Sequence, residues 1–177
     1  MRALLVGLGG VQADLLRLLH ARGWWVGGCS YRAEGPGLEE FDEFAEIDVC
    51  DHDGVTSWAR HCRADAVYAA GMERPMETVA VARARLGLEE WFPRQAAALA
   101  RLKPALRRDL NARGVSPVAF TLVRSAAGLE GWGHYPAVVK PADSAGQRGV
   151  FVAASPEEAV AGLSRTLGFS SNGSAVV

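Results

Sequence analysis

The sequence predicts an α/β protein in which a Rossmann-like domain with a parallel sheet precedes a smaller α+β subdomain. Over roughly the first ninety residues, short apolar runs alternate four times with amphipathic segments, which favours a parallel sheet with helices on both faces. The composition then changes to a segment rich in alanine, leucine and arginine, and near the end two apolar runs flank a loop of small residues, as in a β-hairpin. We place the domain boundary near residues 88–93, which gives domains at residues 1–90 and 91–177.

In the first domain, apolar runs predict strands, and apolar residues at helical spacing predict helices. Strands are expected at residues 2–7, 24–30, 44–49 and 64–70. Helices are expected at residues 11–22, 51–63 and 77–86, with Asp51 or Asp53 as the N-cap of the second helix. Right-handed crossovers would place both the glycine turn after the first strand and the loop at residues 71–75 at the carboxyl edge of the sheet.

The second domain begins with one long expected helix over residues 93–113, which Gly114 ends. After it we expect a strand at 118–122, a short helix within 125–135, a hairpin at 136–152 and a last strand at 174–177. Between the hairpin and the last strand, Ser155, Pro156 and Glu158 suit the N-cap, first and third positions of a further helix.

The composition argues against several classes of function. The 177 residues carry a net charge of −1, so no broad basic field favours nucleic acid or an anionic membrane. No apolar run approaches the length of a membrane span. The first ten residues lead into a helical pattern rather than a cleavage site, so we interpret them as a buried strand and expect a cytoplasmic protein.

The cysteines predict neither a disulfide framework nor a metal site. Cys29, Cys50 and Cys62 are an odd number in an expected cytosolic protein. Cys50 and Cys62 could be combined with His52 and His61, but the spacing matches no common zinc pattern. The neighbouring His61 and Cys62 would also point in different directions from a helix.

The first glycine turn is a weak candidate for a dinucleotide site. Residues 7–12 contain G-x-G, but Gln12 stands where the third glycine of the fingerprint belongs. The second strand ends in residues 29–32, which include no acid that could bind a ribose. A structural turn or a contact with an organic substrate is therefore the favoured interpretation.

Four residues of the expected carboxyl edge are candidates for contact with a substrate. Gly9 and Gly10 belong to the glycine turn, and Glu73 and Arg74 belong to the loop after the fourth strand. Two solvated loop charges explain Glu73 and Arg74 equally well.

Two lysines are stronger candidates for binding an anion. Lys103 and Arg107 are one helical turn apart and share a face, although a solvated surface helix would explain this pair alone. Lys140 ends the apolar run 137–139, where an ammonium group is costly to bury without an anionic partner. The loop at 143–149 is rich in small residues, which let backbone amides approach a phosphate closely. We interpret the hairpin as a phosphate-binding device rather than a plain hairpin with a snorkelling lysine.

These motifs resemble the ATP-grasp ligases, in the branch that includes biotin carboxylase, the large subunit of carbamoyl-phosphate synthase and the amino-acid ligases. Lys103-Pro104-Ala105-Leu106-Arg107 with residues 112–117 resembles the lysine helix of the family. Residues 135–141 with residues 143–150 resemble its phosphate-lid hairpin. Two motifs in this order and at this separation are specific. The resemblance spans essentially the whole chain, with residues 1 to about 88 as the pre-ATP-grasp domain.

The resemblance implies the roles of the candidate residues. Lys103 and Lys140 would contact ATP phosphates. The loop that would close over the β- and γ-phosphates through its backbone amides consists of Ser144, Ala145, Gly146, Gln147, Arg148 and Gly149. Gln147 stands where many members have glycine. The implied reaction is that of a carboxylate–amine or carboxylate–thiol ligase, in which ATP and Mg²⁺ activate a carboxylate as an acyl phosphate.

The family pattern also implies parts that this chain lacks. The acidic hinge that contacts adenine, the Mg²⁺ ligands and a catalytic arginine are expected beyond Val177. By this resemblance we expect the C-terminal ATP-grasp subdomain to be absent and the chain alone to be inactive, and no catalytic or metal-ligating residue is assigned. The expected partners are ATP and a small carboxylate, and uncovered apolar surface would favour a homodimer.

Two other functions stay open at this point. One is a non-catalytic module that binds a nucleotide for regulation. The other, less favoured, is a fragment of a nicotinamide-binding oxidoreductase that uses the first glycine turn.

Overall fold

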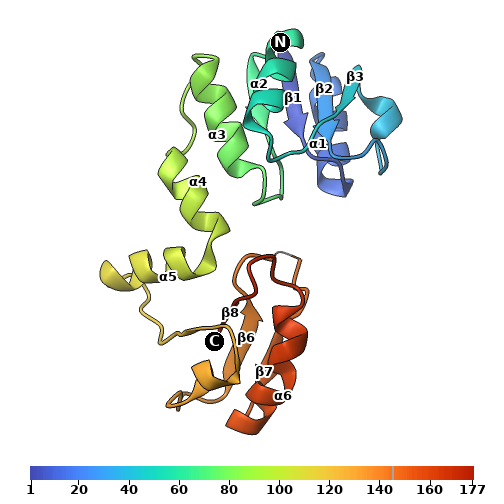
Figure 1. Ribbon diagram of the computed structural model, residues 1–177. Coiled ribbons are helices and arrows are strands. Elements are labelled where there is room, and N and C mark those ends of the chain that lie inside the picture. Colours follow the sequence, from blue (N-terminus) through green and yellow to red (C-terminus); the bar gives the residue numbers. More distant parts are fainter. Residues whose placement is uncertain (145) are drawn as a thin grey trace. The chain divides into compact units, whose positions relative to one another are not determined.

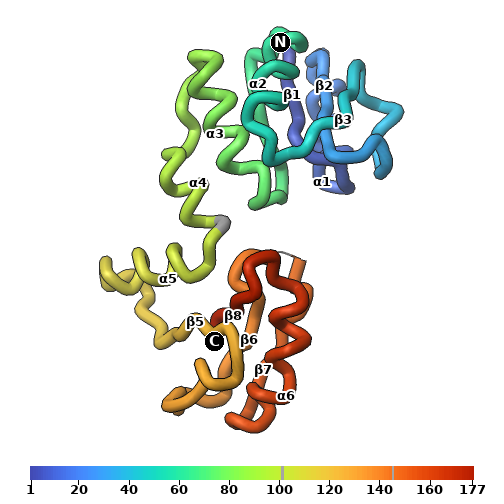
Figure 2. Tube along the Cα trace, viewed as in Figure 1, coloured from blue at the N-terminus to red at the C-terminus, as the bar shows by residue number. Residues whose placement is uncertain are grey.

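The computed structural model describes residues 1–144 and 146–177, apart from the side chain of Arg101. The chain forms two compact units, Met1–Ala98 and Leu99–Val177 (Figures 1 and 2). The division lies inside helix α4 (Arg94–Arg101), beyond the segment 88–93 where the composition changes. Each unit has its own sheet and its own buried core.

The first unit contains a four-stranded parallel sheet with the strand order β3-β2-β1-β4. Its strands are β1 (Arg2–Val6), β2 (Trp25–Ser30), β3 (Glu43–Glu46) and β4 (Ala66–Tyr68). Four consecutive residues of β1, Ala3 to Val6, are buried, as expected for a central strand covered on both faces. The prediction of a parallel sheet is confirmed.

Helices cover both faces of this sheet. They are α1 (Gly10–His20), the short 3₁₀ helix η1 (Leu38–Glu40), α2 (His52–His61) and α3 (Met76–Arg85). Leu5 packs with Leu16 of α1 on one face, whereas Leu4 packs with residues of α2 and α3 on the other. Asp51, not Asp53, is the N-cap of α2, because its carboxylate accepts hydrogen bonds from the backbone N–H groups of residues 53 and 54.

The second unit is built on a four-stranded antiparallel sheet with the order β5-β8-β6-β7. Its elements are α5 (Lys103–Ala112), β5 (Leu122–Val123), the 3₁₀ helix η2 (Ala126–Leu129), β6 (Ala137–Pro141), β7 (Phe151–Ala153), α6 (Pro156–Leu167) and β8 (Ala175–Val176). The expected hairpin is the β6–β7 pair, in which Val139 lies opposite Phe151. The last strand, β8, inserts between β5 and β6. One face of the sheet packs on α6, where Val139 meets Ala159 and Leu163.

The sequence signal for α6 is also confirmed. The hydroxyl of Ser155 accepts a hydrogen bond from the backbone N–H of Glu158, at 3.3 Å. The carboxylate of Glu158 in turn accepts from the backbone N–H of Ala154, at 2.8 Å. This reciprocal pair fixes the start of the helix.

The single helix expected over residues 93–113 is wrong. The chain leaves the helical conformation at Leu102, where φ is −106° and ψ is 91°, so α4 and α5 are separate helices. The reason is Pro104, which has no N–H to donate to the carbonyl of Ala100 in a continuous helix. Proline is tolerated where it stands, in the first turn of α5.

The strand expected at residues 118–122 is shifted. β5 consists of Leu122 and Val123, because these are the residues that pair with β8. Val118 instead exchanges hydrogen bonds with the side chain of Asn111 on α5, at 2.8 and 3.1 Å. A side chain of α5, rather than a neighbouring strand, therefore satisfies the backbone N–H and carbonyl of Val118. Of the helices in the described part of the chain, none is long and apolar enough to cross a membrane.

Candidate functional site

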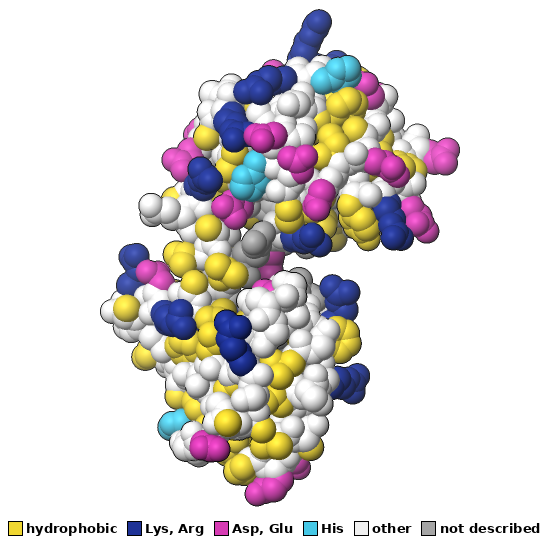
Figure 3. Space-filling model, in the orientation of Figure 1, with side chains coloured by type: hydrophobic (Ala, Val, Ile, Leu, Met, Phe, Trp, Pro, Cys, Tyr) yellow, Lys and Arg dark blue, Asp and Glu magenta, His cyan; other side chains and the backbone are white. Residues whose placement is uncertain are grey.

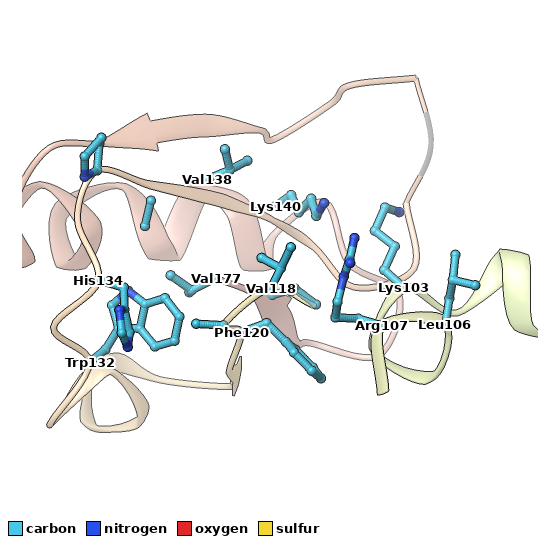
Figure 4. Close-up of a pocket in the computed structure, with 14 residues that line it drawn as sticks. Lys103, Leu106, Arg107, Val118, Phe120, Trp132, His134, Val138, Lys140 and Val177 are labelled. Carbon is cyan, nitrogen blue, oxygen red and sulfur yellow. The ribbon is translucent and has the colours of Figure 1, made fainter. Parts of the chain in front are cut away.

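A groove of about 480 Å³ lies in the second unit (Figure 4). Its walls come from α5, from residues 118–120, from residues 132–138 and from the end of β8. Val138 and Lys140 alternate along β6 with the buried Ala137 and Val139, so their side chains lie on the face of the sheet turned away from α6. Hydrophobic side chains gather next to Lys and Arg side chains on the face of this unit drawn in Figure 3.

One end of the groove is cationic. Lys103 and Arg107 reach it from α5, and Lys140 reaches it from β6; Figure 4 shows the three side chains at the same end. Lys140 is half-buried, and the ammonium group of Lys103 donates to the backbone carbonyl of Ser144. A guanidinium N–H of Arg107 donates to the carbonyl of Ser116, at 3.1 Å. The structure thus brings together the two lysines that lie 37 positions apart in the sequence.

The choice of lysine at these two positions is unusual for this chain. The sequence has 17 arginines but only two lysines, Lys103 and Lys140, and both line the groove. Lysine carries a compact ammonium group with three donors, whereas arginine carries a wide planar fork, so the two are not interchangeable at a close anion contact. The scarcity of lysine in the sequence therefore points to these two residues independently of the motifs in which they lie.

The rest of the groove is apolar and aromatic. Val118, Phe120 and Val138 line its middle, and Trp132 and His134 lie at the end away from the lysines (Figure 4). The rings of Trp132 and His134 meet edge to face, with centroids 5.1 Å apart. No sequence motif includes Phe120, Trp132 or His134, so the sequence alone does not indicate them as groove residues.

The loop expected to cover phosphates is only partly at this groove. Ser144 is linked to the groove through its carbonyl, which accepts from the groove residue Lys103, whereas Ala145 lies outside the described residues. Gly146 and Gln147 have φ angles of 70° and 57°, in the left-handed region. That conformation explains in physical terms why a glycine suits position 147.

The far end of the loop lies at a different place. Gln147, Arg148 and Gly149 line a second groove of about 610 Å³, between the loop and α6, and not the groove of the lysines. Their expected contact with phosphates stays a prediction.

Asp143, at the start of the same loop, is tightly hydrogen-bonded. Its carboxylate accepts from the hydroxyls of Ser170 (2.7 Å) and Ser171 and from the backbone N–H of Asn172 (3.2 Å). Partial burial raises the pKa of Asp143, but these hydrogen bonds together outweigh it and hold the pKa below its ordinary value. The residue is therefore an ionised anchor between the loop and the turn before β8.

In the first unit, the glycine turn and the loop after β4 are neighbours, as their places at the carboxyl edge of the sheet predict. Gly7 has a φ of 102°, and a Cβ built on it would lie 2.3 Å from the sulfur of Met72. The buried side chain of Gln12 donates to the backbone carbonyl of Ala70. Gln12, in the place of the third glycine, thus cross-links α1 to the segment just after β4, which supports a structural interpretation of this turn.

The four substrate candidates lie in these segments. Gly9 is the N-cap of α1 and Gly10 its first residue, while Glu73 is exposed in the loop. Arg74 donates from Nε to the sulfur of Cys50, at 3.2 Å, and this contact raises the pKa of Arg74. No cluster of three or more His, Cys, Asp and Glu side chains suited to a metal ion occurs among residues 1–144 and 146–177.

No protein-family model and no curated protein sequence matches the chain. Solved structures do match it. The L-amino acid ligase from Bacillus licheniformis superposes with a TM-score of 0.74 at 20% identity, over 99% of this chain and 45% of the ligase. The biotin carboxylase domain of the 2-oxoglutarate carboxylase from Hydrogenobacter thermophilus, solved with MgADP, ADP and bicarbonate, gives 0.72 at 16% identity, over 99% and 43% of the two chains. The N5-carboxyaminoimidazole ribonucleotide synthetase from Thermotoga maritima gives 0.68 at 14% identity, over 99% and 45%.

These structures are ATP-grasp ligases, so the resemblance carried by the two motifs is confirmed at the level of the fold. The chain spans less than half the length of each of them.

Proposed function

Because the chain has the fold of the N-terminal part of ATP-grasp ligases, we propose that it supplies one wall of the nucleotide site of an ATP-dependent carboxylate–amine or carboxylate–thiol ligase. The observation that carries the proposal is the groove itself, where the two lysines of the chain converge beside an apolar floor. A nucleoside triphosphate has two parts that match this groove: a polyanionic tail for the cationic end and a flat aromatic base for the apolar part.

The cationic end suits the phosphates. Each lysine would make a charge-assisted hydrogen bond, worth about 1.5–3 kcal/mol, to a phosphate oxygen. Lys103 already donates to the carbonyl of Ser144. Since an ammonium group has three donors, it can hold the loop and a phosphate oxygen together. We propose that the backbone amides of residues 144–149 add further donors when the loop closes over the phosphates, since residues 147–149 line the second groove in the ligand-free chain.

The apolar part suits the base. Val118, Phe120 and Val138 offer an apolar wall on which a purine could pack, and Trp132 offers a ring for stacking at the far end. The groove volume of about 480 Å³ is within the usual range for a small-molecule site.

Magnesium fits this groove poorly. None of the described residues that line the groove is Asp or Glu, and Mg²⁺ takes oxygen ligands. We propose that Mg²⁺ binds with the nucleotide and takes its protein ligands from outside the groove. It would neutralise charge on the phosphates.

In the proposed reaction, a carboxylate oxygen attacks the γ-phosphorus of ATP, ADP leaves, and an amine or thiol then displaces phosphate from the acyl phosphate. This chain would orient the triphosphate through Lys103 and Lys140. Gly9, Gly10, Glu73 and Arg74 are the residues we propose for contact with the carboxylate substrate, since ligands of open α/β sheets bind beyond the carboxyl ends of the strands. A cytoplasmic homodimer is the expected setting.

Tryptophan fluorescence tests nucleotide binding in the chain as it is. Trp132 is the only tryptophan of the second unit, because the other four lie within residues 1–98. ATP should change the emission of the unaltered chain saturably and should leave that of Trp132→Phe unchanged, although calorimetry still detects binding to the variant. An equal change in both proteins would place the nucleotide elsewhere.

The ligase reaction is tested on the complete gene product. Hydroxylamine attacks an acyl phosphate to give a hydroxamate, so a carboxylate that is activated should yield a hydroxamate in the presence of ATP and Mg²⁺. ADP formation that no carboxylate stimulates, without hydroxamate, would count against the proposal.

A further inference from the structure

The loop between β6 and β7 begins at an anchored residue. Asp143 accepts hydrogen bonds from Ser170, Ser171 and Asn172, and so binds the turn that follows α6. The backbone N–H of the preceding Ala142 donates to the carbonyl of Ser174, just beyond this turn, at 3.0 Å. The start of the loop is thus fixed by both backbone and side-chain bonds.

The other end of the loop is anchored as well. The hydroxyl of Thr166, which is fully buried on α6, donates to the carbonyl of Gly149 at 2.8 Å. The ring of Phe169 lies against Gly149 so closely that a Cβ there would be 2.6 Å from a ring carbon. Gly149 also has a φ of 69°, which disfavours any other residue.

Both anchors belong to one short stretch of chain, Thr166–Asn172, at the end of α6 and in the turn after it. This stretch leads into β8, which pairs with β6 so that Val176 lies opposite Lys140. The two ends of the loop and the strand that carries Lys140 are therefore tied to the same support.

We propose that Asp143 and Thr166 are positioning residues, which hold the two ends of the loop in fixed places relative to Lys140. Their purpose in the proposed function is to keep the loop amides within reach of the phosphates that Lys140 binds, and in that respect the inference rests on the proposed function. The anchoring itself does not depend on a ligand.

Two substitutions remove the anchors with little change in shape. In Asp143→Asn, the side-chain NH₂ group cannot accept from Ser171 and Asn172. In Thr166→Val, the buried side chain keeps its volume and loses its donor to Gly149. Thr166→Ser keeps the donor and should restore the behaviour of the unaltered chain.

The first unit offers a matched control. Thr56 is 1% exposed and donates to the carbonyl of His52 within α2 at 2.6 Å, so Thr56→Val removes a buried threonine hydrogen bond far along the chain from the loop. Because the two units have separate cores, this variant controls for the substitution itself, whereas a general loss of stability in the second unit would raise cleavage at other sites of that unit as well as in the loop.

Limited trypsin digestion measures how accessible the loop is to cleavage. The sequence Arg-Gly-Val occurs at 148–150, inside the loop, and again at 113–115, after α5. Cleavage after Arg148 is therefore compared, by mass spectrometry of the ligand-free chain, with cleavage after Arg113 in the same molecule. The ratio cancels differences in protease activity, and the two residues after the cut are the same at both sites.

Thr166→Val should raise this ratio about fivefold, since a hydrogen bond is worth about 1 kcal/mol. Asp143→Asn should raise it about tenfold or more, because several bonds to a charged group are lost. Thr56→Val and Thr166→Ser should leave it within about twofold. An unchanged ratio in Asp143→Asn and Thr166→Val, or an equal rise in Thr56→Val, would overturn the inference.

A parallel digestion is carried out in the presence of ATP. ATP should slow cleavage after Arg148 in the unaltered chain. If it does not, the proposed contact of the loop with nucleotide fails, while the ligand-free ratios still decide the anchoring.

Discussion

Replacing Lys140 with methionine should weaken ATP binding to the chain by about 10- to 100-fold. Lys140 lies at the cationic end of the groove, and its side chain shares a face of the sheet with Val138. Methionine keeps an unbranched apolar stem beside Val138 and removes only the charge. The thermal stability of the second unit should therefore be kept.

The magnitude follows from the contact that is lost. A hydrogen bond to a charged group is worth about 1.5–3 kcal/mol, and 1.4 kcal/mol corresponds to a tenfold change in Kd. Lys140 is half-buried, so solvent screens it less than an exposed lysine. The affinity of Lys140→Arg for ATP should lie between those of Lys140→Met and the unaltered chain, since arginine keeps the charge and changes the geometry of the contact.

Isothermal calorimetry at about 0.15 M salt measures the effect with ATP and with adenosine. The substitution should weaken ATP and leave adenosine almost unaffected, because adenosine has no phosphate. Arg108→Met is the matched control: Arg108 is an exposed cation on α5 that lines neither groove, and its loss should change the Kd for ATP less than twofold. Equal affinity of Lys140→Met and the unaltered chain for ATP, or equal losses in Lys140→Met and Arg108→Met, would refute the reasoning.

Three further predictions concern acid stability, thiol reactivity and packing. Because the folded-state pKa of Asp143 is lowered, its contribution to stability is present above its unfolded pKa of about 3.9 and is lost as the pH falls through the folded pKa; thermal melts should show a weaker acid dependence in Asp143→Asn than in the unaltered chain. Burial raises the pKa of Cys29 to about 12 and of Cys62 to about 11, so dithionitrobenzoate should titrate one of the three thiols of the native protein at about pH 8 and all three after unfolding. Gly162→Ala should destabilise the chain by up to about 2 kcal/mol in denaturant unfolding, since a Cβ would lie 2.3 Å from the Phe151 ring and outweigh the gain of about 1 kcal/mol in helix propensity. The double variant Gly162→Ala with Phe151→Leu should recover most of that loss, and a stabilised single variant would show that the ring moves aside freely.

The elements that local pattern determines could be predicted from the sequence. Buried apolar runs mark β1 and β6, and the N-cap chemistry of Ser155 with Glu158 marks the start of α6. The two lysines could be assigned to one site because each lies in a motif with a known separation. Their meeting in a single groove is what the structure adds to that assignment.

The parts that depend on distant partners could not be predicted. The extent of β5 is set by β8, more than fifty positions later, and by the bonds between Val118 and Asn111. Trp132 and His134 form a wall of the groove only because the chain folds back along β6. The anchoring of Asp143 needs the turn at residues 170–172, which has the composition of an ordinary polar loop.

The central claim is that Lys103 and Lys140 bind one polyphosphate together, and lysine-selective labelling tests it most directly. Reductive methylation with ¹³C-formaldehyde keeps the charge of each amine and should give three signals in this chain, from the two lysines and the N-terminus. On titration with ATP, both lysine signals should shift and fit the same Kd, while the N-terminal signal stays in place; Lys140→Met identifies which lysine signal is which. If only one lysine signal responds to ATP, or the two report different dissociation constants, the lysines do not form a shared phosphate site.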